Sequence, residues 1–80
     1  MQVRIRYFAS LREAVGVSEE AIELPDGATV AQARALLAER RPALAALLPA
    51  CAAAVDRAYA QAETPLRAGA ELAFIPPLGG

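Results

Sequence analysis

The residues whose types and spacing could do chemistry lie at the end of the sequence, where residues 74–80 read FIPPLGG. Glycine serves where a backbone turns through positive φ or where another backbone approaches closely. Gly79 and Gly80 have no turn to make, so we expect this flexible tail to enter a slot too narrow for a side chain. Pro76 and Pro77 fix φ and lack amide protons, so they end strand pairing and reduce the entropy lost when the tail is ordered on binding.

The remaining sequence offers few groups with catalytic chemistry. It contains no His and no Lys, which removes the most common general base, a common metal ligand and the amine of a Schiff base. The single cysteine, Cys51, stands beside alanines, and free cysteine is among the residue types most often buried. We therefore predict that Cys51 belongs to the core, and that the chain has no metal site, no bound cofactor and no catalytic side chain of its own.

Length and charge limit the class of partner. The 80 residues are expected to form one small domain over 1–80. The formal net charge is −1 and neither sign forms a block, which argues against nucleic acid and anionic membrane as partners. The uncharged stretch 42–55 is too short to cross a bilayer, and Pro49 interrupts it. No signal segment precedes the first strand pattern, so we expect a cytoplasmic protein whose partners are proteins or small molecules.

Alternation of polar and apolar residues predicts the strands that must position the tail. Residues 2–7 and 20–24 alternate with a period of two, and residues 71–75 form a last strand before the two prolines. Residues 52–55 are apolar on both faces, which favours a central strand, and a tight turn should lead from them to a short strand at 58–60.

One main helix is predicted to pack on these strands. Thr29 and Gln32 match a capping box, so the helix should begin at about Val30 and end before Pro42, with a second helical turn at 43–48. A right-handed crossover through this helix sets a late strand parallel to the first. The sequence therefore predicts an α+β protein of β-grasp type, with a mixed sheet packed on one main helix.

A short helical turn is expected after the first strand. Phe8, Leu11 and Val15 lie three and four residues apart and should share one buried face. Ser10 is the expected cap of this turn, and Gly16 is its expected end.

Three arginines of the main helix, Arg34, Arg40 and Arg41, could recognise a phosphate or an acidic partner. Arginines near a helix carboxyl end are more often simply solvated and favoured by the helix dipole. We predict that these three are solvated.

Three segments of the chain resemble the small subunits of molybdopterin synthases, a family of ubiquitin-like sulfur carriers. They are YFASLREAVG at 7–16, LPDGATVAQARALL at 24–37 and PLRAGAELAFIPPLGG at 65–80. The resemblance covers nearly the whole chain. Its most specific parts are the FA-x-LRE-x-x-G pattern and the terminal PP-x-GG, because a DGATV helix start is common to many β-grasp domains.

The resemblance implies a role in molybdenum cofactor biosynthesis. A partner enzyme would use ATP to adenylate the terminal carboxylate of Gly80, and sulfur would be installed to give a thiocarboxylate. The tail would then enter the large synthase subunit, in a heterotetramer, and donate its sulfur to a pyranopterin precursor. Gly79 would supply clearance, and Leu78, Pro77 and Phe74 would contact the partner.

The sequence departs from the family pattern at three positions and leaves other functions open. Ala70 replaces an acid, Asp56 replaces Asn in a turn, and Leu78 replaces a smaller residue before the glycines. Leu78 is the departure expected to affect partner choice. The alternatives are a sulfur carrier for thiamine or thiolated tRNA, a ubiquitin-like modifier joined to proteins through Gly80, and an interaction domain with an inert tail.

Overall fold

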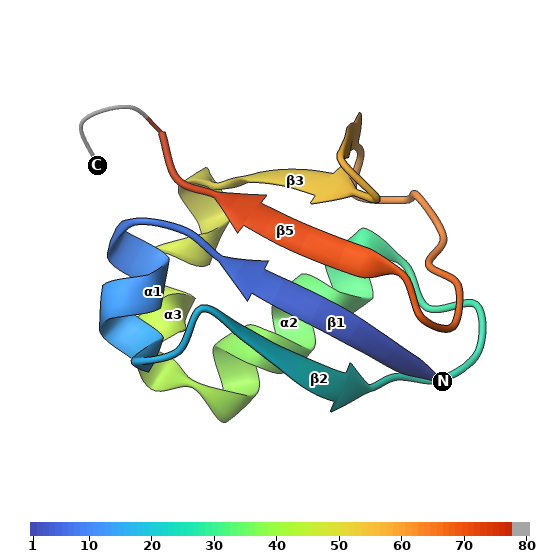
Figure 1. The fold of residues 1–80 in the computed structure, drawn as a ribbon, viewed down its shortest axis with the longest axis horizontal. Coiled ribbons are helices and arrows are strands. Elements are labelled where there is room, and N and C mark those ends of the chain that lie inside the picture. The colour runs from blue at the N-terminus through green and yellow to red at the C-terminus, as the bar shows by residue number, and fades with distance from the viewer. Residues whose placement is uncertain (78–80) are drawn as a thin grey trace.

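The computed structural model describes residues 1–77 of the chain (Figure 1). Its elements, in chain order, are β1 (Gln2–Tyr7), α1 (Ser10–Val15), β2 (Glu19–Glu23), α2 (Val30–Arg40), α3 (Pro42–Ala45), the 3₁₀ helix η1 (Leu48–Ala50), β3 (Ala52–Val55), β4 (Ala58–Ala60) and β5 (Glu71–Ile75). The strands form one mixed sheet in the order β2-β1-β5-β3-β4.

β5 lies in the middle of this sheet, parallel to β1 and antiparallel to β3. In Figure 1, α2 and α3 lie behind the sheet and cover one of its faces, and α1 lies beyond the carboxyl end of β1. β3 has a neighbour on each side, as its apolar residues predict, but the middle position belongs to β5. The parallel β1–β5 pair and the helix packed on a mixed sheet confirm the predicted α+β, β-grasp fold.

Alternate strand residues face the helices and form the core. Val3, Ile5 and Tyr7 of β1 are buried, as their period of two predicts, and Leu72 and Phe74 of β5 are buried beside them. The helices contribute the buried leucines Leu11, Leu37, Leu44 and Leu48. Core packing therefore fixes β5, the strand from which the tail continues.

Local sequence signals fix the start of α2 and the start of the helical turn that follows it. The Thr29 hydroxyl accepts a hydrogen bond from the Gln32 amide at 3.3 Å, and the Gln32 side chain accepts one from the Thr29 amide at 2.8 Å. This confirms the predicted capping box and the start at Val30. The second helical turn takes the form of α3 and η1, and it begins at Pro42 because proline suits the first position of a helix.

The start of α1 differs from the prediction. Ala9, rather than Ser10, is the N-cap, with φ 48° and ψ −121° and no side-chain capping bond. The chain bends at Ala9, so Phe8 lies outside the helix and is 40% exposed instead of packing beside Leu11. The predicted end at Gly16 is confirmed, because its φ of 89° lies in the left-handed region that favours glycine.

Arg34 is not solvated as predicted. Its guanidinium lies over the Phe74 ring, with the central carbon 5.1 Å from the ring centroid. It also donates hydrogen bonds to the carbonyl oxygens of Leu48 and Cys51. Arg34 thus joins α2 to β5 and to the segment that precedes β3, a set of contacts between distant residues that helix periodicity does not encode.

Arg41 also makes a specific contact and corrects the same prediction. Its Nε and Nη2 atoms donate to the two carboxylate oxygens of Glu20 at 2.9 and 2.7 Å, and the Tyr7 hydroxyl donates to Glu20 Oε2 at 2.6 Å. The Arg41 hydrogen bonds hold the pKa of Glu20 below its usual value. Burial, reinforced by the bond to Glu20, raises the pKa of Tyr7 well above its usual value. The cluster joins β1, β2 and the end of α2.

Replacing Glu20 by Gln is expected to lower the free energy of unfolding at neutral pH by about 1–2 kcal/mol, because charge-assisted hydrogen bonds are lost. The folded-state pKa of Glu20 is depressed, so its contribution is present above the unfolded pKa of about 4.3 and is lost as pH falls through the folded pKa. Urea unfolding at neutral and acidic pH measures this. The control is Glu19→Gln, at an exposed carboxylate of the same strand. Equal losses in the two variants at neutral pH would contradict the role of Glu20.

Candidate functional site

The tail continues from the carboxyl end of β5, the middle strand (Figure 1). Pro76 is half-buried, and Pro77, the last described residue, is exposed. Strand pairing ends before these prolines, as predicted. The exposure of Pro77 fits its predicted contact with a partner, which stays a prediction. Leu78, Gly79 and Gly80 lie outside the described residues.

The Phe74 side chain lies on the face of the sheet that packs against the helices, not on the face that a partner could reach. It is fully buried, because alternation along β5 directs it towards the helices, where Arg34 covers its ring. The prediction that Phe74 itself touches a partner is therefore wrong for the described fold. Its neighbour Ile75 has the opposite orientation and is half-buried.

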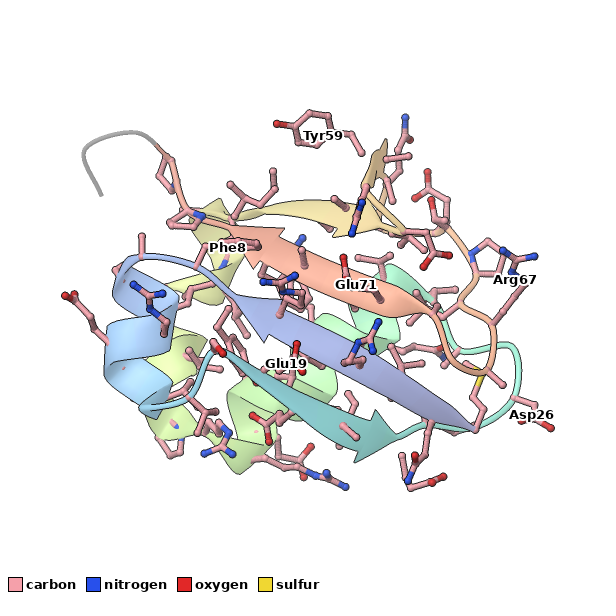
Figure 2. The ribbon with its side chains drawn as sticks, in the orientation of Figure 1. Phe8, Glu19, Asp26, Tyr59, Arg67 and Glu71 are labelled. Atoms are coloured by element: carbon pink, nitrogen blue, oxygen red, sulfur yellow. The ribbon has the colours of Figure 1, made fainter. Side chains whose placement is uncertain are left out.

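A group of apolar residues lies on the face of the sheet that is turned away from the core. We call it the outer apolar face, and it consists of Phe8, Ala54, Tyr59, Ala73 and Ile75. Tyr59 is 81% exposed and Phe8 is 40% exposed (Figure 2). Large apolar side chains that gather on an exposed surface are typical of interaction sites.

Strand register brings these residues together. Ala54 pairs with Ala73 across β3 and β5, and Tyr59 pairs with Ala54 across β3 and β4. Both alanines are 7% exposed, although they face away from the core cluster. Their small side chains form the floor of a hollow of about 290 Å³, with Phe8, Tyr59 and Ile75 among its walls. The hollow could receive an apolar side chain of a partner.

Sequence reasoning missed most of this face, for local reasons. The spacing of Phe8 from Leu11 fits a helical stripe, but the bend at Ala9 ends that pattern. Tyr59 lies on a strand of 3 residues, too short to show a period. Extending the alternation of β1 by one residue places Phe8 on the outer side, and the alternation within β5 places Ile75 there.

Cys51 takes no part in this face. It is buried, and its thiol donates to the Leu47 carbonyl oxygen at 3.3 Å. Burial raises the pKa of the Cys51 thiol, which reduces the thiolate needed for sulfur chemistry. The predicted core position of Cys51 is confirmed.

Residues 1–77 lack two features that would indicate other kinds of site. No helix in this part of the chain is long and apolar enough to cross a membrane. No three His, Cys, Asp or Glu side chains gather there in a way that could hold a metal ion. Whether the chain acts without a metal or bound cofactor stays a prediction.

The sequence matches known proteins over its whole length. Residues 5–80 match the ThiS family. A relative from Chlamydomonas reinhardtii, named molybdopterin synthase sulfur carrier subunit, is 39% identical over 82 residues, which cover 100% of this chain and 99% of the relative.

Solved structures of related size resemble the fold closely. A putative molybdopterin converting factor subunit 1 from Pyrococcus furiosus is 28% identical with a TM-score of 0.88, over 98% of this chain and 99% of that one. The small archaeal modifier protein 1 of Haloferax volcanii is 25% identical with a TM-score of 0.86, over 96% and 98%. A complex of subunits 1 and 2 of molybdopterin-converting factor from Helicobacter pylori contains a chain 26% identical with a TM-score of 0.75, over 100% and 99%.

Proposed function

Because the chain belongs to the ThiS family, we propose that it is a ubiquitin-like sulfur carrier and serves as the small subunit of a molybdopterin synthase. The observation that carries this proposal is the 39% identity with the Chlamydomonas reinhardtii carrier subunit over 100% of this chain. The complex of subunits 1 and 2 from Helicobacter pylori supports a large synthase subunit as the partner.

The carboxylate of Gly80 is the reacting group in this proposal. A carboxylate is a poor electrophile because it has no good leaving group. A partner enzyme joins a carboxylate oxygen to the α-phosphorus of ATP and releases pyrophosphate. Sulfur at the sulfide level, as hydrosulfide or its equivalent, then attacks the carbonyl carbon, AMP leaves, and a thiocarboxylate results. These steps use no side chain of the carrier, which accords with a sequence that has no His and no Lys.

The fold supplies a rigid base for the tail. β5 is paired on both sides and held by the core, so its end has a fixed position. Residues 77–80 span about 13 Å when extended, at roughly 3.3 Å per residue, which is enough to reach a buried pocket in a partner. The sulfur at Gly80 would there be transferred to the pyranopterin precursor.

The outer apolar face is the surface on which the large subunit docks in this proposal. It adjoins β5 where the tail begins, because Ile75 belongs to the face and directly precedes Pro76. Exposed aromatic residues such as Phe8 and Tyr59 are typical anchors of protein interfaces. One docking event would then both bind the carrier and direct its tail.

The finer points of this proposal rest on the family resemblance. They are a heterotetrameric synthase, a separate adenylating enzyme that consumes ATP, and a cytoplasmic location. Each can be tested independently of the role of Gly80.

A second candidate function is attachment to other proteins through Gly80. The likeness to the small archaeal modifier protein 1, with a TM-score of 0.86, favours it. Adenylation of the terminal carboxylate would be the first step in either function. The fate of the activated tail separates the two: a thiocarboxylate indicates a carrier, and an amide bond to a lysine of another protein indicates a modifier.

Reconstitution tests the synthase role. The thiocarboxylated protein, the large subunit and the pyranopterin precursor are expected to yield molybdopterin in proportion to the carrier added. The protein with an ordinary carboxylate at Gly80 is the control and should yield none. A loaded carrier that binds the large subunit but transfers no sulfur would reject the synthase and leave the carrier chemistry standing.

A further inference from the structure

Arginines surround a single carboxylate on the outer side of the sheet. Arg4 and Arg6 of β1 lie on either side of Glu71 at the start of β5, with 3.7 and 3.8 Å between their nitrogens and the same oxygen, Oε1. Arg57, in the turn between β3 and β4, lines the same two hollows as Glu71. Two guanidinium groups therefore share the Glu71 carboxylate, and a third, that of Arg57, belongs to a residue lining the same hollows. Figure 2 shows Glu71 on this side of the sheet.

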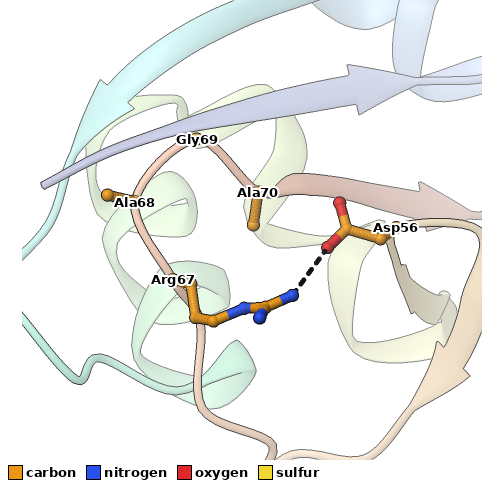
Figure 3. A pocket seen from close by; sticks show the side chains of 5 residues that line it. All are labelled: Asp56, Arg67, Ala68, Gly69 and Ala70. Atoms are coloured by element: carbon orange, nitrogen blue, oxygen red, sulfur yellow. Dashed lines mark ion pairs between the residues drawn. The ribbon is translucent and has the colours of Figure 1, made fainter.

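Two other acids lie nearby. Glu19 is opposite Arg6 in the β1–β2 register, but the ion pair of Arg6 is with Glu71. Asp56 is already occupied. Asp56 Oδ1 accepts the backbone amide of Glu71 at 3.0 Å, and Asp56 Oδ2 lies 3.8 Å from a nitrogen of Arg67 (Figure 3). Arg57 has no carboxylate within ion-pair distance among residues 1–77. In the same part of the chain, the buried Nε of Arg6 lacks a hydrogen-bond acceptor. The cluster has more donors and more positive charge than its own acids satisfy.

The backbone at Arg57 gives a second observation. Asp56 and Arg57 have φ values of 49° and 71°, so both central residues of the hairpin turn are left-handed. Such turns favour glycine at the second position, because any Cβ is strained there. An arginine at this position works against stability. Residues held in unfavourable backbone regions are concentrated at functional sites.

We propose that Arg57, assisted by Arg6, binds a carboxylate of the large synthase subunit, next to an apolar side chain of that subunit seated over Ala54 and Ala73. The inference rests on the proposed function. Arg57 and Arg6 line the same hollow of about 290 Å³ as the two alanines, so one short segment of the partner can reach both. A guanidinium binds a carboxylate through two parallel hydrogen bonds. An acidic protein segment suits the hollow better than a nucleic acid, because the chain as a whole has a net charge of −1.

Three variants separate binding from stability: Arg57→Gln, Arg57→Gly and, as the control, Arg40→Gln. Arg40→Gln removes the same charge from an exposed arginine of α2, the helix behind the sheet. Surface plasmon resonance with purified large subunit at low and high ionic strength measures the rates. Arg57→Gln should raise the Kd about fivefold to tenfold at low salt, partly through slower association, and the difference should shrink at high salt. Arg40→Gln should change the Kd less than about twofold.

Arg57→Gly should weaken binding as much as Arg57→Gln does, but raise the Tm by about 4 °C, since it relieves the left-handed strain. A purely structural role for Arg57 would instead lower the Tm and leave the Kd unchanged. Binding of Arg57→Gln within twofold of the unaltered protein, or an equal loss in Arg40→Gln, would overturn the inference. Failure of the unaltered protein to bind the large subunit would instead overturn the proposed function, and this inference with it.

Discussion

A protein that ends at Gly79 is expected to fold normally and to lose sulfur loading completely. The core and every contact described above lie within residues 1–77, so removing Gly80 takes no contact from them. The new terminal carboxylate is one residue, roughly 3.3 Å, short of the position that the adenylating enzyme requires. Thermal unfolding measures the fold, and release of pyrophosphate from ATP in the presence of the adenylating enzyme measures activation.

Two further variants test whether loading depends on the length of the tail and on the absence of a side chain at Gly79. One additional residue after Gly80 should also abolish loading, because the carboxylate then overshoots the reactive position. Gly79→Val keeps the length but adds a branched Cβ, and it should block activation if the enzyme encloses the tail in a narrow slot. Normal pyrophosphate release by the shortened protein would show that the carboxylate of Gly80 is not the reacting group. Normal release by Gly79→Val would show only that the enzyme has no narrow slot around the tail.

Tyr59→Glu is expected to weaken binding to the large subunit about a hundredfold, equivalent to about 2.7 kcal/mol. The substitution replaces an aromatic anchor by a charge that loses its water on docking. Tyr59 is 81% exposed, so the stability of the free chain should change little. Isothermal titration calorimetry with the purified large subunit gives the affinity, and thermal unfolding gives the stability.

Val17→Glu is the matched control for Tyr59→Glu. Val17 is also a large apolar residue, 45% exposed, but it lies between α1 and β2 and outside the outer apolar face. Its substitution introduces the same charge and should leave the affinity unchanged. Equal affinities for Tyr59→Glu and Val17→Glu would show that the outer apolar face is not where the large subunit docks.

The parts of the fold that short-range signals specify were predictable from the sequence. Thr29 and Gln32 fix the start of α2 through bonds that span 3 residues, and the alternation of Val3, Ile5 and Tyr7 fixes the buried side of β1. These signals depend only on neighbouring residues and on the period of each element. A crossover through the helix then predicts that a late strand runs parallel to the first, and the structure identifies that strand as β5.

The errors concern contacts between residues far apart in the chain. Arg41 and Glu20 are 21 residues apart, and Arg34 reaches Cys51 across 17 residues, so neither contact leaves a periodic trace in the sequence. The unpredicted bend at Ala9 is a second kind of error. Alanine seldom adopts positive φ, so the sequence does not indicate a bend there.

The tail and the outer apolar face also differ in whether the sequence alone reveals them. The tail was recognised from composition and resemblance, because Gly-Gly after two prolines is a contiguous pattern. The outer apolar face draws Phe8, Ala54 and Tyr59 from three separate strands or their ends, and strand register alone brings them together. A surface assembled by register becomes visible only in the folded chain.

The mass of the terminal peptide tests the central claim most directly. After incubation with the adenylating enzyme, ATP and a sulfur source, trypsin cleaves behind Arg67 and releases residues 68–80. This peptide contains neither Met nor Cys, so ordinary side-chain oxidation cannot imitate the exchange of oxygen for sulfur. We predict that it gains the mass of that exchange at Gly80, and only with ATP present. An unchanged peptide, from an enzyme shown to load another carrier, would contradict the account.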